Sequence, residues 1–359
     1  MSNKKITHYS LKAIKSTGAL FYLIFGKKSN GKSYAVKHEL LKDYLQNGIK
    51  FFYVRRWKDE ITMSSVEQYF NDVDVQSLTN GKYNTIVCWR KKIFFANYNP
   101  ETSKTVKGEQ IGYYTALSQE QNVSSESFLD VGNIVFEEFM SRTMYIGKES
   151  EKLMFFYNTV DRNRKTTKLY LVGNTILRTN PYLVDWNLMD IIKTIKQGDI
   201  VKKEIEDTDG NKFLMSIEFC EGNKGGAALN LGKSASNIST GDWLSEPQPK
   251  LPDSYNNYKV VFRFVIERKS FRYLCEYLIT PDKHFIWFIR PKYTKIKDKT
   301  LVISDIVSTN RLHFLTINDC VKSLKNPTLI KIFNTFNDSN IFYCSDLVGT
   351  EFKILKGGF

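Results

Sequence analysis

The sequence contains one loop whose residue types and spacing could bind the phosphates of a nucleotide. The pattern G-x-x-x-x-G-K-[ST] and the residue after it are formed by Gly26, Lys27, Lys28, Ser29, Asn30, Gly31, Lys32, Ser33 and Tyr34. In such a loop the glycines let backbone N–H groups wrap a phosphate, the lysine reaches the β- and γ-phosphates, and the hydroxyl binds Mg²⁺. We therefore predict that the loop binds ATP, with Lys32 also catalytic and Ser33 a magnesium ligand.

A strand and a helix are predicted on either side of this loop. Leu20 to Phe25 is an uninterrupted apolar run, and Ser33 to Gln46 has apolar residues at helical spacing. The N-terminus of that helix would face the phosphates, where its unpaired N–H groups and positive dipole end favour an anion.

A second apolar run, Asn133 to Phe136, ends in the carboxylates Glu137 and Glu138. An ATPase with this kind of loop needs one acid near magnesium and another to orient the attacking water. Ligands of α/β sheets bind at the carboxyl ends of the strands, so both acids are expected beside the loop. We assign Glu137, which replaces the usual aspartate, to the metal and Glu138 to catalysis.

Three further polar residues have the spacing of ATPase accessories. Asn174 follows a predicted strand at Lys168 to Val172 and could sense the γ-phosphate or the attacking water. Arg162 and Arg164 follow a predicted helix at Glu149 to Val160, and one of them could act on a neighbouring subunit as an arginine finger. The sequence does not choose between these two arginines, and both could equally cap the helix or contact DNA.

Basic residues flank two tryptophans after other predicted strands. Arg55, Arg56 and Lys58 surround Trp57, and a run of three basic residues, 90–92, follows Trp89. Such clusters suit contacts with a phosphate backbone, and they could equally form a solvated charged face.

The order of apolar runs predicts the fold. The first 200 residues alternate strand-like and helix-like segments, which predicts a P-loop type α/β domain with a parallel sheet covered by helices on both faces. Additional strands are expected at Ile49 to Val54 and Thr85 to Trp89. Residues 201–250 are predicted to form a lid or linker, because a hairpin at Val201 to Glu218 precedes a Gly-, Ser- and Asn-rich stretch, Gly222 to Asp242.

Residues 251–359 are predicted to form a small α/β domain. Lys259 to Glu267, Phe271 to Thr280 and His284 to Arg290 read as three consecutive strands, followed by a strand at Leu301 to Ile306 and a helix near Ile317 to Phe333. This order is compatible with an RNase H-like fold.

Composition narrows the classes of partner. A net charge of +14 indicates affinity for polyanions, although an AT-rich genome could also explain it. The five cysteines form no pair with metal-site or redox spacing, so we expect reduced, buried thiols. The chain has no long apolar segment, which predicts a soluble intracellular protein that does not enter a membrane.

Together, the segments GKKSNGKSY, IVFEEF, VDRNRK and LYLVGNT resemble the DNA-packaging ATPases of Picovirinae-type phages, compact relatives of the large terminases. The resemblance implies a homo-oligomeric ring, a pentamer by analogy, that hydrolyses ATP with Mg²⁺ and drives double-stranded DNA through the portal into a prohead. It also implies a place in the host cytoplasm and, transiently, at the portal vertex. Some members use a structural packaging RNA, which this sequence does not decide.

Large terminases carry a nuclease in the corresponding C-terminal region, and two-metal cleavage needs several converging carboxylates. The first predicted strand there has Arg263 near its middle and only Glu267 at its end. We therefore predict a nuclease-inactive domain that binds DNA, RNA or the portal. Two alternatives remain: a full terminase with a Mg-dependent nuclease, and a P-loop helicase or switch ATPase.

Overall fold

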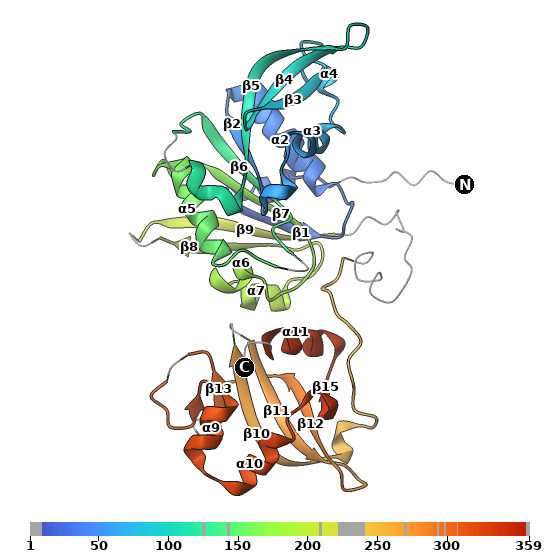
Figure 1. Ribbon diagram of the computed structural model, residues 1–359, viewed down its shortest axis with the longest axis vertical. Helices are drawn as coiled ribbons and strands as arrows, with labels where there is room; N and C mark the ends of the chain where they lie inside the picture. The colour runs from blue at the N-terminus through green and yellow to red at the C-terminus, as the bar shows by residue number, and fades with distance from the viewer. Residues whose placement is uncertain are drawn as a thin grey trace, which may run out of the picture. The chain divides into compact units, whose positions relative to one another are not determined.

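The computed structural model describes residues 9–123, 127–141, 144–207, 210–221, 241–268, 271–292, 294–297, 299–306 and 308–356. The chain forms two compact units. The first contains residues 1–176, 180–185 and 190–242, and the second contains residues 177–179, 186–189 and 243–359. Figure 1 shows one large sheet in the first unit and a smaller sheet in the second.

The first unit is built on a nine-stranded sheet with the order β3-β4-β5-β2-β6-β7-β1-β9-β8. Its six inner strands, from β5 to β9, are parallel, and antiparallel strands complete both edges. The strands are β1 (Phe21–Gly26), β2 (Lys50–Arg55), β3 (Thr85–Trp89), β4 (Lys92–Asn99), β5 (Lys104–Ala116), β6 (Val131–Glu137), β7 (Lys168–Asn174), β8 (Ile200–Glu206) and β9 (Lys212–Cys220).

Helices cover both faces of this sheet because its inner strands are apolar on both sides. On one face, α2 (Lys32–Asn47) and α3 (Met63–Phe70) pack against alternate strand residues such as Ile24 and Val135. On the other face, Phe156 of α5 (Glu149–Asp161) meets Phe52 edge to face, with ring centroids 5.1 Å apart. The remaining helices of the unit are α1 (Lys12–Lys15), α4 (Val75–Leu78), α6 (Pro181–Asp185) and α7 (Met189–Thr194).

The structure confirms the predicted P-loop type α/β fold and corrects the predicted lid. The hairpin predicted within 201–218 exists as β8 and β9, but β9 pairs in parallel with β1 and so belongs to the main sheet. The polar alternation of β8, which the sequence analysis assigned to a lid or linker, is the pattern of an edge strand with one face in solvent. Most of the predicted linker, Gly222 to Asp242, lies outside the described residues.

The second unit has a six-stranded sheet with the order β14-β13-β10-β11-β12-β15. Strands β10 to β12 are antiparallel, and β13 and β14 continue in parallel beside β10, which is the strand order of an RNase H-like fold. The elements are β10 (Lys259–Arg268), β11 (Phe271–Ile279), β12 (Phe285–Pro291), β13 (Val302–Ser304), β14 (His313–Phe314), α9 (Ile317–Leu324), α10 (Pro327–Asn334), β15 (Ile341–Tyr343) and α11 (Asp346–Lys356).

The single helix predicted near Ile317 to Phe333 is wrong, because the chain breaks it into α9 and α10. Lys325 ends α9 in a left-handed conformation (φ 46°), and the Asn326 side chain accepts hydrogen bonds from the backbone of Thr328 and Leu329. Pro327 at the first turn of α10 needs no hydrogen-bond partner for its nitrogen, so the Asn-Pro pair starts a new helix.

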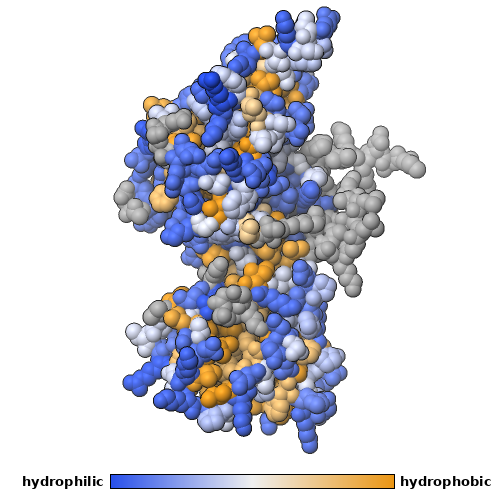
Figure 2. All heavy atoms as spheres, viewed as in Figure 1, coloured by the Kyte–Doolittle hydropathy of each residue, from blue (hydrophilic) through white to orange (hydrophobic). Residues whose placement is uncertain are grey.

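All five cysteines are free, and all except Cys344 are buried. Within the described part of the chain, no helix is both long and apolar enough to cross a bilayer. On the face drawn in Figure 2, apolar side chains gather on the second unit, whereas the first unit is mostly hydrophilic with scattered apolar residues.

Candidate nucleotide-binding site

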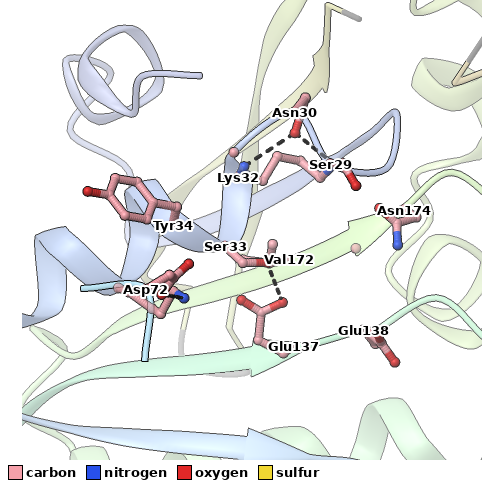
Figure 3. Close-up of a pocket in the computed structure, with 13 residues that line it drawn as sticks. Ser29, Asn30, Lys32, Ser33, Tyr34, Asp72, Glu137, Glu138, Val172 and Asn174 are labelled. Atoms are coloured by element: carbon pink, nitrogen blue, oxygen red, sulfur yellow. Dashed lines mark hydrogen bonds and ion pairs between the residues drawn. The ribbon is translucent and has the colours of Figure 1, made fainter. Parts of the chain in front are cut away.

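The carboxyl ends of β1, β6 and β7 surround a pocket of 390 Å³ in the first unit. Figure 3 shows the loop before α2 on one side of it and the two adjacent acids on the other. The pocket is lined by Ser29, Asn30, Gly31, Lys32, Ser33, Tyr34, Lys37, Asp72, Glu137, Glu138, Val172, Gly173 and Asn174. The strand order thus brings together residues 29–34, 137–138 and 174, as the sequence predicted.

Lys32 is held at the centre of the loop by oxygens of the loop itself. Its Nζ donates to the carbonyl oxygens of Lys27 (2.6 Å) and Gly26 (3.4 Å) and to Oδ1 of Asn30 (3.1 Å). Gly31 has a positive φ of 95° and therefore suits the tight entry into α2. Burial lowers the pKa of Lys32 to about 8, partly offset by Cys220, Glu137 and Glu218.

Gly26 allows the backbones of β1 and β9 to approach each other closely. A Cβ atom at this position would lie 2.8 Å from the carbonyl oxygen of Cys220 on the neighbouring strand β9. Its φ of 153° adds to the preference for glycine. The main sheet therefore fixes the start of the loop through β9, a strand that the sequence analysis had assigned to the lid.

Ser33 and Glu137 are placed to share a magnesium ion. The Ser33 hydroxyl donates to Oε2 of Glu137 at 3.0 Å, so a hydroxyl and a carboxylate oxygen converge beside the loop. Mg²⁺ prefers such oxygen ligands, usually one or two carboxylates together with substrate phosphates and water. These two residues therefore fit the ion. Within the described ranges, no group of three or more His, Cys, Asp or Glu residues could hold a metal ion.

Tyr69 on α3 completes the surroundings of Glu137. Its hydroxyl donates to Oε1 at 2.8 Å, so both carboxylate oxygens have a fixed partner. Burial raises the pKa of Glu137, and the hydrogen bonds from Tyr69 and Ser33 oppose that rise. Sequence reasoning missed Tyr69 because α3 carries no motif that marks a residue directed at the pocket.

Glu138 lies next to Glu137 but has a different partner. It adopts a left-handed conformation (φ 57°), and its side chain is 57% exposed. Nη2 of Arg55, at the end of β2, donates to Oε2 of Glu138 at 2.8 Å. Arg55 thus contacts the predicted catalytic acid in this chain, and its predicted DNA contact stays a prediction.

Arg56 does not fit the predicted DNA contact, because it is only 4% exposed. Its Nε bonds both oxygens of the buried Glu149, at 3.0 and 2.8 Å, and its terminal nitrogens donate to the carbonyls of Glu138 and Phe139. A buried charge in such a network is tied to its partners, so Arg56 positions the chain that carries Glu138. Lys58 alone of the three predicted DNA contacts is exposed.

Asn174 is the last residue of β7 and pairs in register with Gly26 of β1. The next residue strengthens this link, because the backbone N–H of Thr175 donates to the Gly26 carbonyl at 3.1 Å. The sensor predicted from sequence is therefore at the phosphate end of the pocket (Figure 3).

Arg162 and Arg164 lie near the amino-terminal ends of the strands, whereas the loop lies at their carboxyl ends. Arg164 donates to the carbonyl of Val131, which begins β6, whereas Glu137 ends that strand. At about 3.3 Å per residue the two ends are roughly 20 Å apart. Neither arginine can therefore act on the pocket of its own chain without a large rearrangement.

The two arginines differ in their surroundings. Arg164 also donates to the carbonyls of Leu129, Val160 and Asp161 and to the Thr167 hydroxyl, so its guanidinium is held by the chain. Arg162 is exposed and caps α5 in a left-handed conformation (φ 46°). The carboxylate of Asp161 organises this loop by accepting from the backbone of residues 165–167.

The second unit presents no comparable cluster of acids. The central acid of its sheet is Glu276 on β11, which is fully buried and bonds Arg263 at 2.7 Å and Arg290 at 2.9 Å. The Tyr255 hydroxyl donates to the same carboxylate at 2.9 Å. Across the described residues, three acids or other metal ligands do not meet anywhere in this unit.

A phosphate loop between a buried strand and a helix, with two acids at the end of a nearby parallel strand, defines a P-loop nucleotide-binding protein. The chain belongs to the Podovirus DNA encapsidation protein (Gp16) family, whose model matches residues 3–214.

The sequence is similar to two proteins described as DNA packaging proteins. That of Bacillus phage phi29 is 29% identical over 208 residues, which are 57% of this chain and 58% of the relative. That of Bacillus phage B103 is 29% identical over 189 residues, 52% of this chain and 54% of the relative. The match thus spans less than two thirds of the length of these relatives.

One solved structure, "The bacteriophage Phi-29 viral genome packaging motor assembly", is similar along almost the whole chain. It is 18% identical, covers 98% of this chain and 99% of the other, and gives a TM-score of 0.58. At this identity the similarity establishes the fold.

Proposed function

We propose that the protein hydrolyses ATP and uses the energy to move double-stranded DNA into a prohead. The observation that carries the proposal is the contact of Ser33 in the phosphate loop with Glu137, beside a second acid, Glu138. Family membership supports DNA as the object that is moved.

Each of the pocket residues would have a separate role in phosphoryl transfer. Lys32 would leave the loop carbonyls and bind the β- and γ-phosphates, while Glu138 orients a water molecule and accepts its proton. Asn174 would hydrogen-bond the γ-phosphate or that water. Ser33 and Glu137 would hold a magnesium ion, which would supply positive charge against the charge of the phosphates.

Arg55 gives this site a second level of control. Oε2 of Glu138 already accepts a hydrogen bond from Arg55, so this oxygen is not available to a water molecule while the pair is closed. Catalysis therefore requires the Arg55–Glu138 pair to open or to shift toward the pocket.

Arg162 is the better candidate for a finger that enters the pocket of a neighbouring subunit. It is exposed on a loop built around Asp161, whereas Arg164 is held by carbonyls. This role implies a homo-oligomeric ring, for which a pentamer on the portal is our working arrangement. The ring would act in the host cytoplasm at the portal vertex, with or without a packaging RNA.

The second unit would bind DNA, RNA or the portal without cutting DNA. Its central acid is neutralised by two arginines, which does not suit a two-metal nuclease. Plasmid nicking in Mg²⁺ would contradict this part of the proposal and support a full terminase.

The proposal is tested by DNA packaging into proheads, measured as protection of DNA from nuclease. Lys32→Ala should abolish protection, and Lys42→Ala, which removes an exposed lysine from the same helix, should not. Packaging by Lys32→Ala at the wild-type level would overturn the proposal.

A further inference from the structure

One edge of the main sheet carries an exposed aromatic and basic surface that the proposed ATPase site does not use. Strands β3, β4 and β5 form its antiparallel edge. Residues on one side of these strands, such as Ile86, Ile93 and Phe95, are buried in the core. Because side chains alternate along a strand, the other side carries Trp89 and Lys92, both exposed.

Trp89 organises two cations on this surface. Its side chain is 43% exposed, an unusual position for a tryptophan. The guanidinium carbon of Arg90 lies 4.3 Å from the ring centroid, and Nζ of Lys107, from β5, lies 3.7 Å from it. Cation–π contacts restrict these long side chains before any partner arrives, which lowers the entropy lost on binding.

The turn between β3 and β4 places two basic residues in an unfavourable backbone conformation. Trp89 pairs with Lys92, so Arg90 and Lys91 form a two-residue turn, and both have positive φ angles of 47° and 61°. Such turns favour Asn-Gly, because residues with larger side chains are strained in the left-handed region. Two basic residues at strained positions therefore point to a use for their charges.

The charge of this edge is strongly positive. Residues 85–112 contain five cations and two acids, and one of the acids, Glu109, is already bonded to Lys82 and Tyr44. Figure 1 shows the β4–β5 hairpin extending from the first unit, and residues 89–92 and 107 of these strands are all exposed. We name the surface formed by Trp89, Arg90, Lys91, Lys92 and Lys107 the edge cluster.

We propose that the edge cluster binds the phosphate backbone of double-stranded DNA. The inference rests on the proposed function, which supplies the duplex as substrate, and on the preorganised cations, which suit phosphates better than base edges. The contact is independent of sequence and depends on salt, because binding releases counterions from the DNA.

The first experiment measures duplex binding by fluorescence anisotropy over a range of salt concentrations, without ATP. Arg90→Gln/Lys107→Gln is compared with Lys42→Gln/Lys202→Gln, which removes two exposed lysines on α2 and on β8 at the opposite edge of the sheet. We expect the first variant to bind about tenfold more weakly and to reduce the salt slope by about 2, with little change in the control. Equal losses in both variants would overturn the proposal, since net charge would then explain them.

A second variant separates a functional role from a structural one. Arg90→Asn/Lys91→Gly gives the turn its preferred residues, so we expect a higher melting temperature together with weaker duplex binding. Unchanged duplex binding, or tighter binding to single strands than to duplex, would overturn the proposal. Because binding is measured without ATP, failure of the ATPase proposal would appear separately, as absent turnover in a wild type that still binds duplex through this surface.

Discussion

Acidic residues have different surroundings at the strand ends of the first sheet and at the centre of the second sheet. In the first unit, Glu137 and Glu138 face a pocket and are held by a serine, a tyrosine and one arginine. In the second unit, Glu276 is fully buried between Arg263 and Arg290. The carboxylates at the strand ends of the first sheet are therefore accessible to a ligand, whereas the central carboxylate of the second sheet is not.

The largest effect is expected from the loop after α5, where Arg162 is exposed and Arg164 is held by carbonyl groups. Arg162→Ala should reduce ATP turnover of the assembled ring by about 10³-fold or more, the usual effect of losing an arginine finger. Arg164→Ala should instead lower stability, because five acceptors lose their donor. Turnover assays and thermal unfolding of both variants test this assignment, and normal turnover in a folded Arg162→Ala ring would contradict it.

A matched substitution at the two sheets sharpens the comparison. Glu137→Gln should lower turnover by about 10²- to 10³-fold, because a charged group in the transition-state environment is lost. Glu276→Gln should leave turnover unchanged and destabilise the second unit by about 1–2 kcal/mol, since two half-exposed arginines keep contact with water. Steady-state turnover and thermal unfolding of each variant measure these effects, and loss of turnover in both would break the distinction.

Tyr69→Phe should weaken Mg²⁺-dependent nucleotide binding by about tenfold, because groups that orient a metal ligand affect metal affinity. Magnesium titration with a fluorescent nucleotide analogue measures this without turnover. Tyr170→Phe is the matched control, since the buried hydroxyl of Tyr170 has no hydrogen-bond partner among the residues that the structure describes. Equal effects of both substitutions would show that Tyr69 only fills space.

A smaller, pH-dependent effect is expected at Asp161. Burial acts to raise its pKa, but hydrogen bonds from Thr167 and from the backbone of residues 165–167 outweigh burial and lower it. A lowered pKa in the folded state stabilises the protein above pH about 4 and loses that contribution as the pH falls through the folded value. Asp161→Asn should therefore cost about 1 kcal/mol at pH 7 and less at pH 3.5 in urea unfolding. A constant difference at both pH values would contradict this explanation.

The parallel sheet and most of the pocket could be predicted from the sequence, because both depend on patterns of residues that are close together in the chain. Apolar runs fix buried strands, and a sequence motif fixes the conformation of the phosphate loop, so Lys32, Glu137 and Asn174 could be placed before the structure was known. The position of Tyr69 could not be predicted, because it depends on a hydrogen bond to Glu137, 68 residues further along the chain. The burial of Arg56 depends in the same way on Glu149, 93 residues further along the chain. Strand β9 was assigned to the wrong region because its partner is far away in the sequence: Phe21 of β1 pairs with Met215 of β9.

The central claim is tested most directly by steady-state ATP hydrolysis with and without long double-stranded DNA, for the wild type and Glu138→Gln. We predict that DNA stimulates the wild type, and that Glu138→Gln binds nucleotide but loses turnover by about 10²-fold or more. Turnover by Glu138→Gln at the wild-type rate would contradict the assignment of the catalytic acid and, with it, the mechanism proposed for the pocket.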